Sequence, residues 1–360
     1  MSIPLNILRI TQNDIDVIGS RESVITPKKL VGESYVEGSN YIFEINENIT
    51  INKGQTLKDF KNIIVKHYAE IKNGGTIDNC TITLNTNKTV YNWYHSKILN
   101  GFVDNRGNKF DGNINNCTIT VNNGSGILNG NGGIGNIIGS NITFNDGSGI
   151  SNGDLDIGNI INGNITFNDE SYINNGINSE GNIIGCTITL SNDSHINNSY
   201  IKCGNISNCT ITLIGSSKIY NGYYFGGIIS NSYIFIHNEA TLQNFYNDRI
   251  STRYGILTNT YIFAFGGKIQ NTYNGNSGTF NSTILKFSND CEIDKTIDDK
   301  KIYIVLNKTK MNGLNSITKQ LNNTSRNNIS RNVTNKDNTL NKLLLINHLT
   351  QLIIKLYYEI

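Results

Sequence analysis

Cys117-Thr-Ile-Thr-Val121 returns with little change along the chain, as Asn141-Ile-Thr-Phe144, Asn164-Ile-Thr-Phe167, Cys186-Thr-Ile-Thr-Leu190, Cys209-Thr-Ile-Thr-Leu213 and Tyr233-Ile-Phe-Ile236. The central isoleucines of these segments are 23 residues apart: Ile119, Ile142, Ile165, Ile188, Ile211 and Ile234. A fixed period of about 20–50 residues indicates a repeat architecture, in which neighbouring units stack on one another. No unit has an apolar pattern long enough for a helix.

Each period contains two further apolar positions. One comes eight residues after the central isoleucine, and the other comes five residues before it, as in Ile127 and Ile114 around Ile119. Asn, Gly, Asp and Ser bound each position, so the pattern predicts three short strands and three corners per 23 residues. A single unit cannot bury its apolar row, but parallel pairing with the next unit can. The pattern therefore predicts an all-β fold, a parallel β-helix, and the unequal spacing favours the right-handed type.

Strand alternation assigns the two faces of each strand. In Cys-Thr-Ile-Thr-Leu the first, third and fifth side chains point inward and both threonines point outward. An asparagine follows each second apolar position by two residues, which predicts a ladder of side-chain amides at one corner. Its predicted core members are Asn129, Asn152, Asn175, Asn198, Asn221 and Asn244, with Asn92 and Asn271 in the same column.

The ends of the chain do not repeat. Residues 1–47 are expected to form a cap or attachment segment, with a helix starting at Thr11 and a short turn at Pro27. Residues 48–306 form the predicted parallel β-helix, and 307–338 read as a polar linker. Residues 339–360 show an amphipathic helical pattern with Leu345, Leu349, Leu352 and Leu356. That helix is expected to cap the solenoid, to oligomerise, or to lie on a membrane surface.

One long insertion interrupts the repeat. Ile82 and Ile119 are 37 residues apart, and with Val90 as the second apolar position the extra residues fall at 91–113. This stretch contains the only tryptophan of the chain and several other aromatic residues: Trp93, Tyr94, His95, Phe102 and Phe110. A loop that leaves a regular solenoid is a candidate binding loop. The other interpretation is that its aromatic side chains cover the face of a coil.

A second aromatic group replaces the outward threonines toward the C-terminus. Tyr233 and Phe235 take these positions in one unit, and Tyr261 and Phe263 take them in the next. Contiguous exposed apolar surface marks a contact site. We expect another chain, a sugar or the C-terminal segment of this chain to bind there.

Charge and sorting signals limit the classes of function. The net charge is +2, so no strong field favours nucleic acid. The N-terminus lacks the basic start and apolar run of a signal peptide, and no segment reaches about 18 apolar residues, so no transmembrane segment is expected. Asn-X-Ser/Thr sequons lie within the predicted strands, which favours synthesis in the cytosol. The six cysteines are expected to be reduced.

Few side chains at the outward positions are suited to catalysis or metal binding. No carboxylate pair suited to acid–base catalysis occurs there, and no cofactor is expected. Asp146 and Asp169 stack at one corner and are a weak Ca²⁺ candidate, although both are also ordinary turn residues. The alternative function is a polysaccharide lyase or glycoside hydrolase that uses the insertion as its substrate wall. It requires Asp104, Asp111, Asp146 and Asp169 to converge on one groove.

The repeat architecture resembles the pectate-lyase-like superfamily of β-helix proteins over about residues 40–306, but no catalytic motif is shared. The Asn-rich, Pro-poor composition is similar to that of giant-virus β-helix proteins, with phage tailspikes and surface adhesins as neighbouring analogues. The Thr-x-Thr rows also resemble insect antifreeze β-helices, although Asn and aromatic residues interrupt them. The resemblance to viral and adhesive β-helix proteins implies a non-enzymatic structural or adhesive rod of a virion or cell surface. Its expected partners are structural proteins or a surface glycan, and it is expected to form a homo-oligomer, possibly a trimer.

Overall fold

The computed structural model describes residues 6–20, 23–35, 41–66, 68–85, 96–222, 226–244, 255–273, 276–288, 290–294, 297 and 303–305. The chain divides into two units, Met1–Val305 and Leu306–Ile360. The predicted linker at 307–338 and the predicted helix at 339–360 lie outside the described residues.

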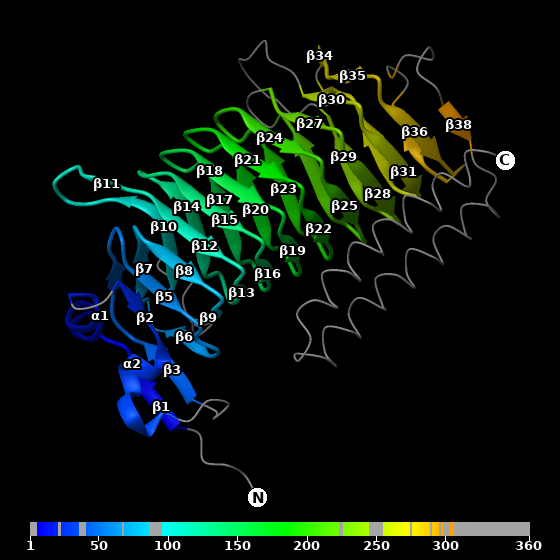
Figure 1. Ribbon diagram of the computed structural model, residues 1–360. Coiled ribbons are helices and arrows are strands. Elements are labelled where there is room, and N and C mark those ends of the chain that lie inside the picture. The colour runs from blue at the N-terminus through cyan, green and yellow to red at the C-terminus, as the bar shows by residue number, and fades with distance from the viewer. Residues whose placement is uncertain are drawn as a thin grey trace, which may run out of the picture. The chain divides into compact units, whose positions relative to one another are not determined.

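The first unit is a stack of coils built on three parallel sheets (Figure 1). We name them sheet A, sheet C and sheet B, in the order in which each coil passes through them. Sheet A contains β1 (Asn6–Arg9), β3 (Tyr41–Ile45), β6 (Ile63–Lys66), β9 (Thr81–Asn85), β13 (Thr118–Val121), β16 (Asn141–Phe144), β19 (Asn164–Phe167), β22 (Thr187–Leu190), β25 (Thr210–Leu213), β28 (Tyr233–His237), β31 (Tyr261–Phe265), β36 (Ile284–Phe287) and β38 (Tyr303–Val305).

The other two sheets hold the second and third strands of each coil. Sheet C contains β4 (Ile49–Ile51), β7 (Glu70–Asn73), β10 (Lys97–Val103), β14 (Gly126–Asn131), β17 (Gly149–Asn152), β20 (Tyr172–Asn175), β23 (His195–Asn198), β26 (Lys218–Asn221), β29 (Thr241–Gln243), β32 (Lys268–Gln270) and β37 (Glu292–Ile293). Sheet B contains β2 (Val24–Ile25), β5 (Thr56–Lys58), β8 (Thr76–Asp78), β12 (Gly112–Asn115), β15 (Gly135–Ile138), β18 (Gly158–Ile161), β21 (Gly181–Ile184), β24 (Gly204–Ser207), β27 (Ile228–Ser230), β30 (Ile256–Thr258) and β35 (Thr279–Asn281).

The strands pair in register from coil to coil. Ile119 of β13 pairs with Ile142 of β16, which pairs with Ile165 of β19. Sheets C and B repeat the pattern, with Ile127 beside Ile150 and Ile114 beside Ile137. The predicted parallel β-helix with 23-residue, three-strand coils is therefore confirmed.

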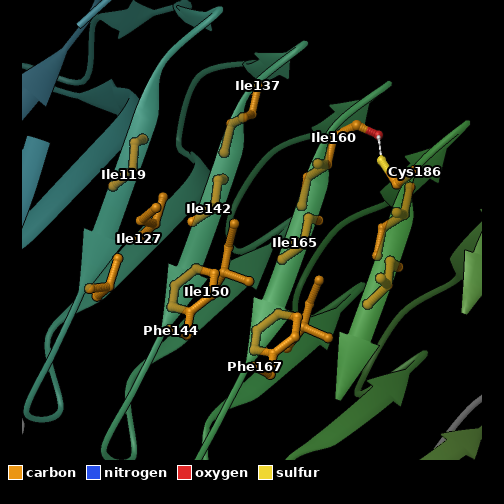
Figure 2. Close-up of a cluster of buried hydrophobic side chains, with 14 of the residues drawn as sticks. Ile119, Ile127, Ile137, Ile142, Phe144, Ile150, Ile160, Ile165, Phe167 and Cys186 are labelled. Carbon is orange, nitrogen blue, oxygen red and sulfur yellow. Dashed lines mark hydrogen bonds between the residues drawn. The ribbon is translucent and has the colours of Figure 1, made fainter. Parts of the chain in front are cut away.

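The core consists of columns of aliphatic side chains, one from each sheet (Figure 2). Ile119, Ile127 and Ile114 are fully buried, and each buried isoleucine contributes about 1.5–3 kcal/mol of transfer free energy. Phe144 and Phe167 stack inside the coils with ring centroids 4.9 Å apart. Because every coil repeats these columns, each unit covers the apolar row of its neighbour.

Four cysteines lie in the small inward position at the start of sheet A. Cys80, Cys117, Cys186 and Cys209 are buried and carry free thiols, as predicted. The Cys186 thiol donates to the carbonyl oxygen of Ile160 at 3.6 Å (Figure 2). Contact with Cys186, together with burial, raises the pKa of the Cys209 thiol, which favours its protonated form.

Single residues in the left-handed region turn the chain at its corners. Asn116 and Asn162 have φ values of 54° and 53° between sheets B and A. Asp146 and Asp169 have φ values of 54° and 52° between sheets A and C. Asn and Asp tolerate this conformation better than other residues with a Cβ atom.

The N-terminal segment joins the sheets earlier than its sequence indicates. β1 pairs with β3 in sheet A, and β2 pairs with β5 in sheet B. Helix α1 (Gln12–Gly19) begins with the predicted Thr11 cap, which forms a capping box with Asp14. Helix α2 (Pro27–Val31) begins at Pro27, and the 3-10 helix η1 (Gly32–Ser34) follows it. Among the described residues these are the only helical elements.

The register predicted for the insertion is wrong. Ile98, rather than Val90, pairs with Ile71 and Ile127 in sheet C, and Asn100 therefore replaces Asn92 in the amide column. Extra residues thus lie on both sides of β10, because Ile98 follows Ile82 by 16 positions where the regular coils have eight.

After β10 the insertion folds back as a hairpin with β11 (Lys109–Phe110). Phe102 is buried and stacks on Phe110 at 4.9 Å. A Cβ atom on Gly74 would lie 2.6 Å from the Phe110 Cβ atom, so the aromatic pair packs on bare backbone. This part of the insertion covers a coil. Two short strands, β33 (Thr272–Tyr273) and β34 (Asn276–Ser277), form a separate antiparallel pair.

Candidate functional site

The asparagine column forms a continuous buried ladder. Each amide donates to the side-chain oxygen of the asparagine in the next coil, at 2.7–3.1 Å, along Asn73, Asn100, Asn129, Asn152, Asn175, Asn198, Asn221, Asn244 and Asn271. Each of the first eight also donates to a backbone carbonyl, as from Asn129 to Asn159 at 3.1 Å. The column therefore satisfies its own polar groups inside the fold, which identifies it as structural.

A column of glycines makes room for this ladder. Gly181 begins β21 beside Asn175, and a Cβ atom on Gly181 would lie 2.3 Å from the Asn175 Oδ1 atom. Sheet B strands from β12 to β24 begin with the equivalent glycine. These glycines are the sequence signal that accompanies the ladder.

An array of stacked aromatic rings lies on the outward side of sheet A. Tyr233 stacks on Tyr261 with ring centroids 5.2 Å apart, and Phe235 stacks on Phe263 at 5.3 Å. The four residues were predicted as binding residues, and their pairing follows from the in-register contact of β28 with β31. The tyrosines are half-buried, whereas Phe235 and Phe263 are only 7% and 4% exposed.

Three more residues extend this array beyond the predicted set. His237 stacks on Phe265 at 4.8 Å with ring planes 8° apart, which adds a third pair to β28 and β31. Lys286 of β36 pairs with Phe263, and its ammonium lies 6.0 Å from the centroid of that ring. The alternation of β28 and β31 places residues 237 and 265 outward with 233 and 261, and this signal was available in the sequence. We call these seven residues the aromatic array: Tyr233, Phe235, His237, Tyr261, Phe263, Phe265 and Lys286.

The pKa shifts within the aromatic array are those expected in apolar surroundings. Burial raises the pKa of the Tyr233 hydroxyl, and the neighbouring Tyr261 acts in the same direction. Burial also lowers the pKa of Lys286. Both shifts favour the uncharged forms, as expected where rings displace water. The array can therefore offer ring edges and tyrosine hydroxyls to a ligand.

A smaller aromatic pair lies outward on sheet C. Tyr172 stacks on His195 with centroids 5.8 Å apart, and Lys218 follows in the same column. The ring of Tyr172 lies over Gly149, where a Cβ atom would be 2.6 Å from it. Burial lowers the pKa of His195, and the charge of Lys218 adds to this effect, while a backbone hydrogen bond at Asp193 opposes it.

The four carboxylates required by the alternative enzymatic function do not come together. Asp104 closes the β10–β11 hairpin by accepting from Arg106 and Asn108, and Asp111 accepts from the backbone of Ile134 beside sheet B. Asp146 and Asp169 occupy the opposite corner, at the start of sheet C. No group of three or more His, Cys, Asp or Glu side chains suited to a metal occurs within the described part of the chain.

The remaining predicted binding residues, Trp93, Tyr94 and His95, lie outside the described residues. Within the described part of the chain, no helix is long and apolar enough to cross a membrane.

The fold and its surfaces define the class of protein as a parallel β-helix repeat protein with aromatic and amide columns. Comparison with known proteins adds no closer assignment, because no family model, curated protein or solved structure matches the chain. The resemblance to polysaccharide-cleaving, viral and adhesive β-helix proteins therefore stays a prediction.

Proposed function

We propose that this protein is a non-enzymatic repeat rod that binds an extended glycan through its aromatic array. The observation that carries the proposal is the alignment of Tyr233 with Tyr261 on the outer side of sheet A. The two rings lie one above the other along the stacking direction, with centroids 5.2 Å apart. A linear polymer that repeats its own hydroxyl and apolar groups is suited to such a surface.

Tyrosine supplies both kinds of contact that a sugar requires. Its ring offers apolar surface, and its hydroxyl donates or accepts a hydrogen bond. Tyr233 lies between Thr210 and Tyr261 in its column, and Ile284 follows Tyr261, so ring edges and hydroxyls are what remain for a ligand. The Phe235–Phe263 pair supports the tyrosines from the middle of the same strands.

A partner protein is the second candidate ligand. Tyr233 and Tyr261 are the accessible part of the array for such a partner, because Phe235, Phe263 and His237 are only 7%, 4% and 8% exposed. Aromatic residues are enriched in the cores of protein–protein interfaces, with polar groups around them. A structural protein of the same assembly would suit this arrangement.

The place of action that we propose is a virion or a cell surface. The support is compositional and comes from the Asn-rich repeats of a chain with only two prolines. A regular scaffold whose asparagine side chains hydrogen-bond one another can stay folded without a bound cofactor. Such a scaffold suits a virion or a cell surface.

A glycan-array screen combined with a reducing-sugar release assay on every hit tests this function. The proposal predicts binding to at least one extended glycan and no release of sugar from it. Release of reducing ends would contradict the non-enzymatic function and favour the lyase or hydrolase. The absence of any glycan hit would overturn the glycan as ligand and favour the partner protein.

A further inference from the structure

The outward side of sheet B carries two uncharged columns that the proposed function does not use. The first is a second amide ladder, formed by Asn113, Asn136, Asn159, Asn182 and Asn205, with hydrogen bonds of 2.9–3.1 Å between neighbours. These amides are half-buried, in contrast to the fully buried ladder. Asn136, Asn159, Asn182 and Asn205 each use one N–H in the ladder, which leaves a second N–H for a group beyond the sheet.

The second column is aliphatic and lies beside the amides. Ile138, Ile161 and Ile184 follow one another in register, and Ile138 and Ile184 are 39% and 36% exposed. Three more exposed apolar side chains border the amide ladder: Ile134, Leu155 and Ile201. We call the two columns and these three residues the sheet B face.

Charge is missing from these columns over a long distance. From β12 to β35 each outward position of sheet B holds Asn, Ile, Ser or Thr. The first charged residues appear at the N-terminal end, where Lys58 and Asp78 form a salt bridge of 3.1 Å. Exposed surfaces ordinarily carry charges that prevent association, and the two columns themselves carry none, while Asp111, Glu180 and Lys202 lie at their border.

We infer that the sheet B face pairs with the same face of a second copy of this chain, with the two solenoids antiparallel. A two-fold axis parallel to the strands places the amide column of one copy on the amide column of the other. It also places the two aliphatic columns on each other. Centred on Ile161, it sets Ile138 of one copy against Ile184 of the other. The parallel arrangement would place amides on isoleucines and leave their free N–H groups without partners.

The size of the face predicts a weak, reversible dimer. Five strands from β12 to β24 extend about 24 Å, and about six residues across the strands, with the bordering side chains, extend about 20 Å. Each copy then buries about 480 Å², or about 960 Å² in total, which is below the about 1,200 Å² of a stable specific interface and in the range of transient ones. Association in the micromolar range is the expectation.

Sedimentation equilibrium of the full-length chain, from about 1 to 500 μM, tests this pairing. The wild type is expected to shift from monomer to dimer. Ile161→Lys places two ammonium groups beside the two-fold axis, so its dissociation constant should rise at least about tenfold. Ile64→Lys is the matched control, because Ile64 points outward on sheet A, and it should leave the dissociation constant unchanged. Circular dichroism checks that both variants keep their strands.

A cross-linking experiment avoids the introduced charge. In a Cys203→Ser/Cys291→Ser background, which removes the two half-buried native thiols, Ile161→Cys should give a covalent dimer with a short bis-maleimide, and Ile64→Cys should not. A wild type that stays monomeric throughout, a dimer unaffected by Ile161→Lys, or equal cross-linking of the two cysteine variants would each overturn the inference.

Discussion

At the scale of single residues, the fold depends on polar side chains that are buried and fully paired. Asn175 accepts from Asn152 and donates to Asn198, both at 2.8 Å, and it also donates to the carbonyl of Gly181 at 3.1 Å. A buried amide without partners would destabilise the protein by a few kcal/mol, whereas a complete ladder avoids this cost.

Asn175→Ala should therefore lower the free energy of unfolding by about 2–4 kcal/mol, because Asn152 loses an acceptor and Asn198 loses a donor inside the fold. Asn159→Ala is the matched control, since Asn159 makes the same two ladder bonds but is half-buried. Water can replace the hydrogen bonds of Asn159, so Asn159→Ala should lower the free energy of unfolding by less than about 1 kcal/mol. Urea unfolding followed by circular dichroism measures both, and equal losses would refute the structural role of the buried ladder.

The half-buried imidazole of His195 predicts a pH dependence of stability. Burial lowers its pKa below the ordinary value of 6.5, so the unfolded chain binds the proton more readily than the folded one. The contribution of neutral His195 to the free energy of unfolding is complete above pH 6.5. It is lost as the pH falls toward the lower pKa of the folded state. His195→Phe keeps a ring against Tyr172 and should flatten the thermal-stability profile below pH 6.5 relative to wild type. Identical profiles would contradict the prediction.

At the scale of elements, strand alternation made most inward and outward positions predictable. Asp146 and Asp169, predicted both as turn residues and as a weak Ca²⁺ candidate, have left-handed backbone at a corner. The insertion was misread because a fixed spacing selected Val90. The better signal was local: Ile98-Leu-Asn-Gly101 repeats Ile127-Leu-Asn-Gly130, including the glycines with positive φ at 101 and 130.

The core columns predict that substitutions on the two faces of one strand differ sharply in their effect on stability. Phe167→Ala should destabilise the protein by about 3–5 kcal/mol, because it removes a fully buried ring that stacks on Phe144. Thr166→Ala, on the outward side of the same strand, should change stability by about 0.5 kcal/mol or less. Chemical unfolding of the two variants gives the comparison, and a Phe167→Ala loss as small as that of Thr166→Ala would contradict the assigned core.

At the scale of the whole molecule, each coil contacts mainly its neighbours, so whole coils should be removable. Deletion of residues 164–186 takes out one period and joins Gly163 to Thr187, which preserves every column. This variant should fold with the circular dichroism of the parent. Deletion of 164–185 is the control, because one extra residue exchanges the inward and outward faces at the junction. Equal folding of both deletions would contradict a register set by the columns.

The sequence was less informative about the binding surface than about the fold. Periodicity placed Tyr233, Phe235, Tyr261 and Phe263 outward, but the pairing of β28 with β31 spans 28 residues instead of 23. Strand alternation also places His237 and Phe265 outward, whereas the contact of Lys286 with Phe263 depends on the pairing of β31 with β36. A ligand leaves no periodic signal, so the partner of the array could not be predicted from the pattern alone.

The most direct test of the proposed function is the dissociation constant of a glycan hit for wild type and for Tyr233→Ala/Tyr261→Ala. Thr120→Ala/Thr143→Ala is the matched control, because these threonines are half-buried and outward on the same sheet. Binding through the array predicts that the tyrosine variant binds at least about tenfold more weakly, a loss of about 1.4 kcal/mol, and that the control binds like wild type. Equal affinity of all three proteins would contradict the account.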